Sequence, residues 1–163
     1  MSEPVVRLRD VDIVFGDNPR AALPLIDEGR NRPDIQEATG QILGVCGCSL
    51  DIAEGEVLVL MGLSGSGKST LLRGVNGLNP VIRGSVEVRC DDEWINPETC
   101  SAAKLRQLRL NHVSMVFQQF NLWSHMTILQ NVMEAPVTVL RQDSGEVEAR
   151  ARAYLDKVGI GDK

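Results

Sequence analysis

The fold of this chain is decided by the stretch Gly62-Leu63-Ser64-Gly65-Ser66-Gly67-Lys68-Ser69-Thr70. It matches the phosphate-binding pattern G-x-x-x-x-G-K-[ST] at every fixed position. The apolar run Glu56–Met61 before it is typical of a buried parallel strand, and Thr70–Asn76 after it favours a helix. Strand, glycine loop and helix in this order are what a phosphate cradle requires. The sequence therefore predicts a nucleotide-binding site, and an incidental glycine-rich turn is the alternative.

Each residue type in the loop suits a bound phosphate. The glycines let the backbone curl so that its N–H groups point inward, and the new helix turns its unpaired N–H groups toward the same anion. Lys68 supplies a mobile positive charge for the β- and γ-phosphates, and Ser69 supplies a hydroxyl for Mg²⁺. The predicted nucleotide contacts in the loop are Gly62, Ser64, Gly65, Ser66, Gly67, Lys68, Ser69 and Thr70.

Composition sets the broad class of the chain. Its 163 residues, 43% hydrophobic and 24% charged, are enough for one domain with a real core. The longest apolar stretch, Val57–Leu63, is far shorter than the ~20 residues of a membrane-spanning helix. Met1–Pro4 shows no pattern of a secretory signal. We expect a cytoplasmic chain, or one that lies peripherally on the inner face of the cell membrane.

Charge and cysteine spacing exclude other classes. The net charge is −5 with no basic block, which argues against nucleic acid as a partner. The four cysteines do not have the spacing of zinc ligands. Cys46 and Cys48 alternate in a predicted strand, so we expect both to be small buried residues on one side of it.

Alternating and helical patterns predict the other elements. Strands are expected at Val5–Phe15, Val45–Ile52, Gly84–Arg89 and His112–Phe117. Helices are expected at Ala21–Glu28, Pro33–Thr39 and Ala102–Leu110. Another begins at Thr127–Val132 and must kink or end at Pro136. In the last segment, one face of a helix is marked by the spacing of Val147, Ala151, Tyr154, Leu155 and Val158. On the other face of that last helix, the pairs Glu146–Arg150 and Glu148–Arg152 have the spacing of ion pairs.

With the phosphate loop, a glutamine after a predicted strand and this order of elements, the chain resembles the ATP-binding subunit of an ATP-binding cassette (ABC) transporter over essentially its whole length. The resemblance implies an α/β fold of the P-loop NTPase, ABC-ATPase type, with a mixed sheet and flanking helices. Val116-Phe117-Gln118 resembles the family's Q-loop, which makes Ser69 and Gln118 the implied Mg²⁺ contacts. Phe15 lies where the family has an aromatic residue that stacks on adenine, although Tyr is commoner there and a core aromatic is the alternative.

The resemblance also divides the chain and implies partners. It assigns residues 20–44 to a helical insertion, 62–70 to the phosphate loop, and 117–135 to the Q-loop region and the start of a helical subdomain. The implied cofactors are ATP and Mg²⁺. The implied partners are transmembrane permease subunits, contacted through the Q-loop region, and a second ATP-binding subunit in a homodimer of the complete protein.

Two branches of importers are represented in different parts of the chain. Up to about residue 115, including residues 20–44 and Val59–Ser64, the sequence resembles importers of choline and glycine betaine. Phe120–Thr127 and Asn131–Pro136 resemble importers of histidine, arginine and ornithine. A hybrid gene or a joining error near Val113–Gln119 is the favoured interpretation, and one divergent natural protein is the alternative. Import of a choline or betaine type of solute is preferred to import of basic or polar amino acids.

The resemblance stops before the family's signature motif, its Walker B strand with the catalytic Glu, and its switch His, and His112 and His125 do not replace them. We therefore expect this chain alone to bind ATP without hydrolysing it, and to expose sheet edges that lower its solubility. A non-catalytic ATP-binding remnant is the alternative from another class. A GTPase or small-molecule kinase is disfavoured by the missing Asn-Lys-x-Asp motif, and a DNA-repair ATPase by the acidic charge.

Overall fold

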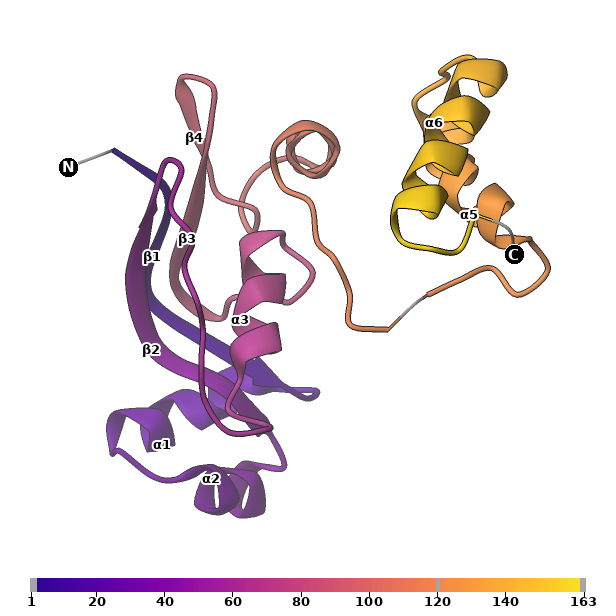
Figure 1. The fold of residues 1–163 in the computed structure, drawn as a ribbon. Coiled ribbons are helices and arrows are strands. Elements are labelled where there is room, and N and C mark those ends of the chain that lie inside the picture. Colours follow the sequence, from indigo (N-terminus) through magenta and orange to yellow (C-terminus); the bar gives the residue numbers. More distant parts are fainter. Residues whose placement is uncertain (1–2, 120, 162–163) are drawn as a thin grey trace. The chain divides into compact units, whose positions relative to one another are not determined.

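The computed structural model describes residues 3–119 and 121–161. The chain divides into two compact units, Met1–Met115 and Val116–Lys163, and each is described here by itself. Figure 1 shows the order of their elements. Among the helices within the described ranges, none has the length and apolar character to cross a membrane.

An antiparallel sheet forms the base of the first unit. The strand order is β2-β1-β3-β4, so β1 is paired along both of its edges. Leu8, for example, faces Leu50 on one side and Val86 on the other. The bounds are Pro4–Phe15 for β1, Ile42–Ala53 for β2, Arg83–Cys90 for β3 and Glu93–Ile95 for β4. The three corresponding predicted strands and the α/β fold are therefore confirmed.

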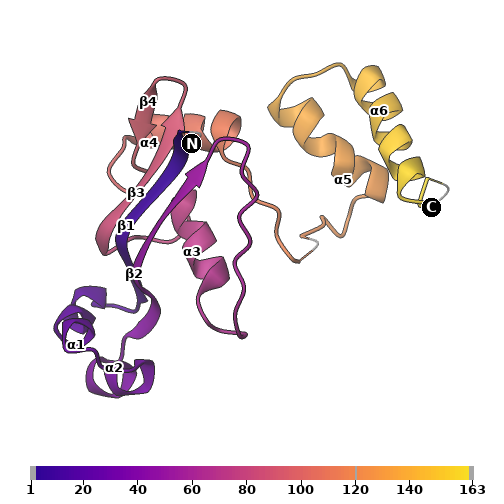
Figure 2. The same cartoon turned by 60° about the vertical axis from the view of Figure 1, so that its left-hand side comes forward.

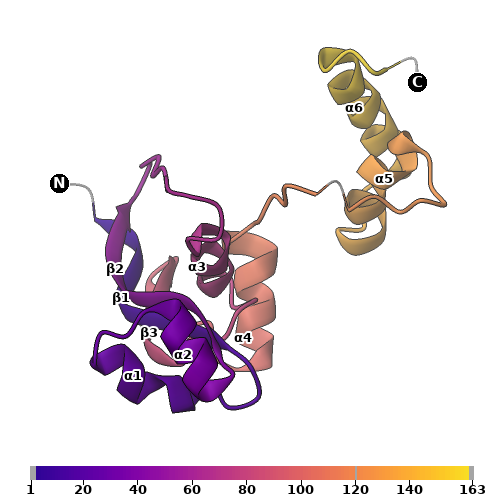
Figure 3. The same cartoon turned by 90° about the horizontal axis from the view of Figure 1, so that it is seen from below.

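Helix α3 (Lys68–Val75) follows the phosphate loop and lies against one face of this sheet (Figures 1 and 3). Its Leu71 packs into a buried cluster with Leu8, Val11 and Ile13 of β1. Helix α4 (Ala102–Gln107) continues through a π-helical turn, Leu108–His112, and the fully buried Leu108 packs on β3 and β4. Both predicted helices are confirmed, and the second runs two residues further than expected.

The helices predicted between β1 and β2 are present, within residues 20–44, the segment that the resemblance assigns to a helical insertion. The insertion consists of a 3₁₀ turn at Pro19–Ala22, helix α1 at Leu23–Asp27 and helix α2 at Arg32–Thr39. Its apolar side chains, with Ile35 fully buried, form a core of their own against the ends of β1 and β2. The fully buried Asp12 of β1 and the exposed Asp27 of α1 both accept hydrogen bonds from Arg83, at 2.5 Å each. The insertion is thus fixed to the sheet.

Two predicted strands are wrong. Glu56–Met61 forms no strand, and its apolar side chains are mostly exposed. His112 ends the π-helical turn, and residues 113–117 form no strand either. A buried parallel strand needs a neighbour on each edge, and within the described residues every strand pair is antiparallel and involves neither segment.

The expectation for Cys46 and Cys48 is also wrong, since Cys46 is exposed and Cys48 is only half-buried. Between them Gly47 has φ +55°, and the register of β2 against β1 shifts at this point. A bulge breaks the alternation of side chains on which the expectation rested.

The second unit is helical. Helix α5 (Ile128–Glu134) begins with a capping box in which Thr127 and Gln130 bond each other's backbone N–H groups, and it passes into a π-helical turn, Ala135–Val139, that contains Pro136. Helix α6 (Ser144–Lys157) lies beside α5 (Figure 2). Helix α5 ends at Glu134, two residues before Pro136, so the expectation of a kink or an end at Pro136 is met by the end of the α-helix. Phe120, which belongs to the predicted Q-loop region, lies outside the described residues.

On α6 the predicted pattern holds in part. Val147, Ala151 and Leu155 are buried as expected, whereas Tyr154 and Val158 are exposed. The ion pair between Glu148 and Arg152 is present at 2.8 Å. The described residues show no ion pair between Glu146 and Arg150, because the guanidinium of Arg150 bonds the side chain of Gln142 instead.

Candidate nucleotide-binding site

The phosphate loop adopts a conformation that requires glycine. Gly62, Gly65 and Gly67 have φ values of +154°, +77° and +102°. Gly67 is the N-cap of α3, and a Cβ placed on it would lie 2.3 Å from the carbonyl oxygen of Gly44 on β2. The start of α3 is therefore in close contact with the sheet, and the N–H groups of its first turn have no partner within the helix and can bind an anion.

Lys68 folds back over the loop. Its Nζ donates hydrogen bonds to the carbonyl oxygens of Gly62, at 2.9 Å, and Leu63, at 2.7 Å, and to the hydroxyl of Ser66, at 3.2 Å. These partners are neutral, and a phosphate oxygen is a stronger acceptor for an ammonium group. The side chain is thus held at the centre of the loop, within reach of an anion bound there.

A hollow of about 410 Å³ adjoins the loop. Its apolar wall includes Val45, Leu60 and Leu71, and its polar wall is the loop itself. The lining residues carry two cations, Arg32 and Lys68, and among the described residues no carboxylate lines the hollow. The electrostatic balance of the site therefore favours an anion.

Arg32 was not among the residues predicted for the site. It is the first residue of α2, and its guanidinium bonds the carbonyl oxygens of Gly65, Ser66 and Gly44. The sequence does hold a signal for it. A positive charge in the first turn of a helix is opposed by the helix dipole, so an arginine directly after the N-cap Asn31 calls for a partner outside its helix.

The remaining predicted nucleotide contacts differ in their exposure to solvent. Ser64, Ser66 and Ser69 are exposed, and Thr70 is half-buried. Phe15 is half-buried at the end of β1 and packs against the cluster under α3. A Cβ on Gly44 would lie 2.9 Å from both the Phe15 ring and the Thr70 methyl group. The structure thus brings Phe15 to the start of α3 in a core contact, and stacking on adenine stays a prediction.

The predicted Mg²⁺ pair is divided between the two units. Ser69 belongs to the first unit, and Gln118 is an exposed residue of the second. The joint role of these two residues therefore stays a prediction. Elsewhere in the described ranges, no three His, Cys, Asp or Glu side chains come together in an arrangement suited to a metal ion.

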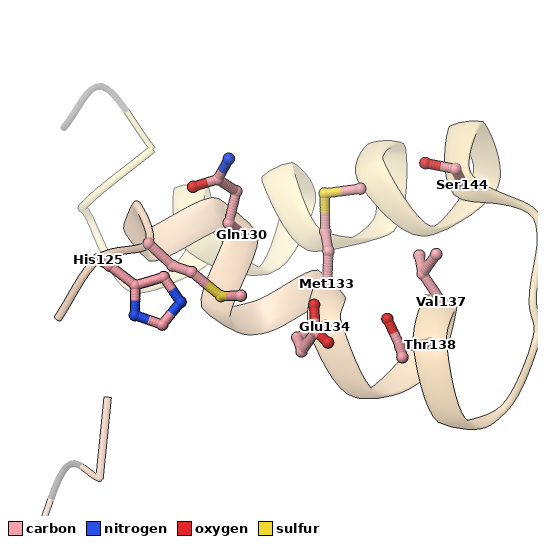
Figure 4. Close-up of a pocket in the computed structure, with 8 residues that line it drawn as sticks. His125, Gln130, Met133, Glu134, Val137, Thr138 and Ser144 are labelled. Atoms are coloured by element: carbon pink, nitrogen blue, oxygen red, sulfur yellow. The ribbon is translucent and has the colours of Figure 1, made fainter. Parts of the chain in front are cut away.

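The second unit has a hollow of its own, of about 390 Å³ (Figure 4). Most of its lining comes from the predicted Q-loop region and from α5 and the π-helical turn after it. The lining residues are His125, Met126, Gln130, Met133, Glu134, Val137, Thr138 and Ser144. The ring of His125 also meets Trp123 edge to face, with centroids 5.9 Å apart.

A sequence profile of the family described as "ABC transporter" matches residues 45–163. The trimethylamine N-oxide transport system ATP-binding protein TmoW of Ruegeria pomeroyi is 42% identical over 98% of this chain and 45% of its own length. The histidine transport ATP-binding protein HisP of Pseudomonas aeruginosa is 44% identical over 80% of this chain and 53% of its own length.

A third relative and a solved structure agree with these. The glycine betaine/proline betaine transport system ATP-binding protein ProV of Salmonella typhimurium is 44% identical over 91% of this chain and 39% of its own length. The dimeric structure of the ATP-binding cassette MJ0796 bound to ADP and Pi matches with a TM-score of 0.66 and 28% identity, over 93% of this chain and 56% of that one. The chain thus spans about half the length, or less, of the curated relatives quoted.

Proposed function

The chain belongs to the ABC transporter family, and from this membership we propose that it binds ATP with Mg²⁺ as part of the ATP-binding subunit of an importer. The observation that supports the proposal most strongly is the loop itself. Gly67 starts α3 in a conformation that a larger residue cannot adopt beside Gly44, and Lys68 is held across the loop by neutral acceptors that a phosphate can replace.

Each residue has a distinct part in this proposal. The N–H groups at the start of α3 and the ammonium of Lys68 bind the phosphate oxygens. The exposed hydroxyl of Ser69 and the side chain of Gln118 hold Mg²⁺, and Phe15 stacks on adenine. When bound, Mg²⁺ neutralises charge on the phosphates.

Hydrolysis is proposed for the complete protein and not for residues 1–163 alone. These residues supply a phosphate cradle, one metal hydroxyl and a glutamine, whereas phosphoryl transfer also needs an oriented water and stabilisation of charge in the transition state. A signature motif, a catalytic Glu and a switch His, together with a second subunit, are proposed to supply the rest. For this chain we expect ATP binding without phosphate release.

For the solute we propose a quaternary amine or a compound of that type. The support is that TmoW, named for trimethylamine N-oxide, matches 98% of the chain, against 80% for HisP. The ProV proteins of Salmonella typhimurium and Escherichia coli, named for betaines, match 91% and 77%. Import of amino acids is the second candidate, because HisP is equally similar over the part that it matches. A junction near residues 113–119 is tested by sequencing the source gene through this region.

The proposed partners are permease subunits, contacted through residues 118–133 on the inner face of the membrane. The hollow of Figure 4 supports this choice of region, because apolar and polar side chains of α5 line an open surface there. Cross-linking of a cysteine placed at Gln130 to co-expressed permease subunits tests the contact, and failure to cross-link from any position in this region would contradict it.

Lys68→Ala tests the nucleotide site directly. We expect Mg-ATP to bind about 100-fold more weakly by calorimetry, because the ammonium makes more than one charged hydrogen bond to phosphate. Lys104→Ala is the matched control, since Lys104 pairs with Glu93 and lies outside the lining of the hollow. Unchanged affinity in Lys68→Ala would contradict the assignment of the site, and phosphate release by the wild-type chain would contradict its inactivity.

A further inference from the structure

A contact between the helical insertion and the phosphate loop is not part of the function proposed so far. Arg32, at the start of α2, donates from Nη1 to the carbonyl oxygen of Gly65 at 2.6 Å. From Nη2 it donates to the carbonyl oxygens of Gly44, at 2.8 Å, and Ser66, at 3.0 Å. One side chain therefore joins three backbone segments: the insertion, β2 and the loop.

The position of Arg32 is fixed by the packing and capping of its own helix, α2. Asn31 caps α2 by accepting a hydrogen bond from the Asp34 N–H at 3.0 Å, and the fully buried Ile35 anchors the helix in its own core cluster. Arg83 holds Asp27 of the neighbouring helix α1. The guanidinium therefore projects from a supported helix, which limits the entropy that its hydrogen bonds must overcome.

Holding these carbonyl groups also sets the direction of N–H groups. In a trans peptide the C=O and the following N–H point in opposite directions, and no cis peptide is present in the described residues. Because the Ser66 carbonyl points toward Arg32, the Gly67 N–H points away from it. Within the described part of the chain this N–H donates no hydrogen bond, so it is available to an anion.

The charge of Arg32 acts in the same direction. Arg32 lines the same hollow as Lys68, and among the described residues it forms no ion pair with a carboxylate. A guanidinium is charged at every working pH. Its positive potential is therefore not cancelled locally, and it adds to the attraction for phosphate.

We propose that Arg32 is a positioning residue that holds the phosphate loop in its anion-binding shape and thereby makes nucleotide affinity depend on the helical insertion. The inference rests on the proposed nucleotide site and deepens it. Arg32 acts through the loop backbone and is given no contact with the reacting atoms. A partner that displaces the insertion from the sheet would then weaken nucleotide binding at the loop.

The test compares Arg32→Met, which keeps the apolar stem of the side chain, with Arg30→Met. Arg30 belongs to the same insertion, and its one ion pair among the described residues is with Glu28, at 3.3 Å. In the full chain we expect Arg32→Met to bind Mg-ATP and inorganic pyrophosphate about tenfold more weakly, and Arg30→Met to bind both as the wild type does. Arg32→Lys should recover part of the loss, because one ammonium can hold one of the three carbonyls.

A spectroscopic measurement separates positioning from general destabilisation. In the wild-type chain, pyrophosphate should shift the amide resonance of Gly67, and this shift should be lost in Arg32→Met while the nucleotide-free melting temperature changes little. Wild-type affinity and an unchanged Gly67 shift in Arg32→Met, alongside lost binding in Lys68→Ala, would overturn the inference and leave the nucleotide site standing. Equal losses in Arg30→Met and Arg32→Met would also overturn it. Failure of the wild-type chain to bind either probe would instead overturn the proposed function.

Discussion

Strand β1 and the segment Glu56–Met61 are built from the same kinds of residue and have opposite environments. In β1, Val11 and Ile13 are 0% exposed, whereas Val57 and Met61 are 89% and 87% exposed. Strand β1 is paired on both edges, by β2 and β3, while Glu56–Met61 has no strand partner among the described residues. An apolar β-prone run therefore shows that a segment can enter a sheet, and its burial depends on partners elsewhere in the chain.

Amide hydrogen exchange gives the largest contrast between the two segments. Residues 57–61 donate no backbone hydrogen bond within the described residues, so their amides should exchange at nearly unprotected rates. Amides in the doubly paired part of β1, Val6–Leu8, should exchange about a thousandfold more slowly or more, because they open only with the sheet. Residue-resolved exchange by NMR measures both. Comparable protection of the two segments would show that Glu56–Met61 is paired after all.

A matched pair of substitutions gives the next largest effect. Val11→Ala removes two methyl groups from a fully buried position, and we expect it to lower the free energy of unfolding by about 2 kcal/mol. Val59→Ala makes the same change at a side chain that is 68% exposed, and should alter the free energy by less than about 0.5 kcal/mol. Urea denaturation of both variants measures the difference. Equal losses would mean that Val59 packs as tightly as Val11.

The contrast explains which features the sequence could predict. Glycines, helix caps and alternating patterns act over a few residues, and they located β1, β3, α2 and the phosphate loop. The bulge at Gly47 and the missing partners of Glu56–Met61 depend on segments far away in the chain. The pattern within one segment carries no information about such distant partners. The predicted burial of Cys46 and the predicted parallel strand were therefore wrong.

The candidate site shows the same division. Lys68 follows from the spacing of the motif, and the hydrogen bonds that its ammonium forms within the described ranges go to residues at most six positions away. Arg32 lies 33 residues from Gly65 in sequence and meets it only because the insertion folds against β2. Its position in the first turn of a helix, where the dipole opposes a positive charge, indicated locally that it has a partner outside the helix. Such a sign indicates that a partner exists and does not identify it.

The smallest expected effect on stability comes from an exposed ion pair between β1 and β2. It tests whether pairing in the sheet stabilises the chain where the side chains are not buried. On β2, Asp51 accepts a hydrogen bond from the guanidinium of Arg9 on β1 and forms an ion pair with it, and both side chains are about half exposed. This hydrogen bond, opposed by some desolvation and aided by the charge of Arg9, lowers the pKa of Asp51 from its ordinary value. Pairing in the sheet thus brings the two groups together without burying them, and solvent weakens their attraction.

Because the pKa of Asp51 is lower in the folded chain than in the unfolded one, its contribution to stability is complete above about pH 4 and is lost as the pH falls through the folded pKa. We therefore expect Asp51→Asn to lower the melting temperature by about 2 °C at pH 7, and this difference to shrink as the pH falls below about 4. Glu37→Gln on α2 is the control, since Glu37 forms no ion pair in the described residues. A difference that stays constant down to pH 2 would show that Asp51 stabilises β2 by packing and not by its charge. If Asp51→Asn lowered the melting temperature as much as Val11→Ala does, this exposed pair would stabilise the sheet as much as a core residue. That result would contradict the conclusion that burial is what distinguishes β1 from Glu56–Met61.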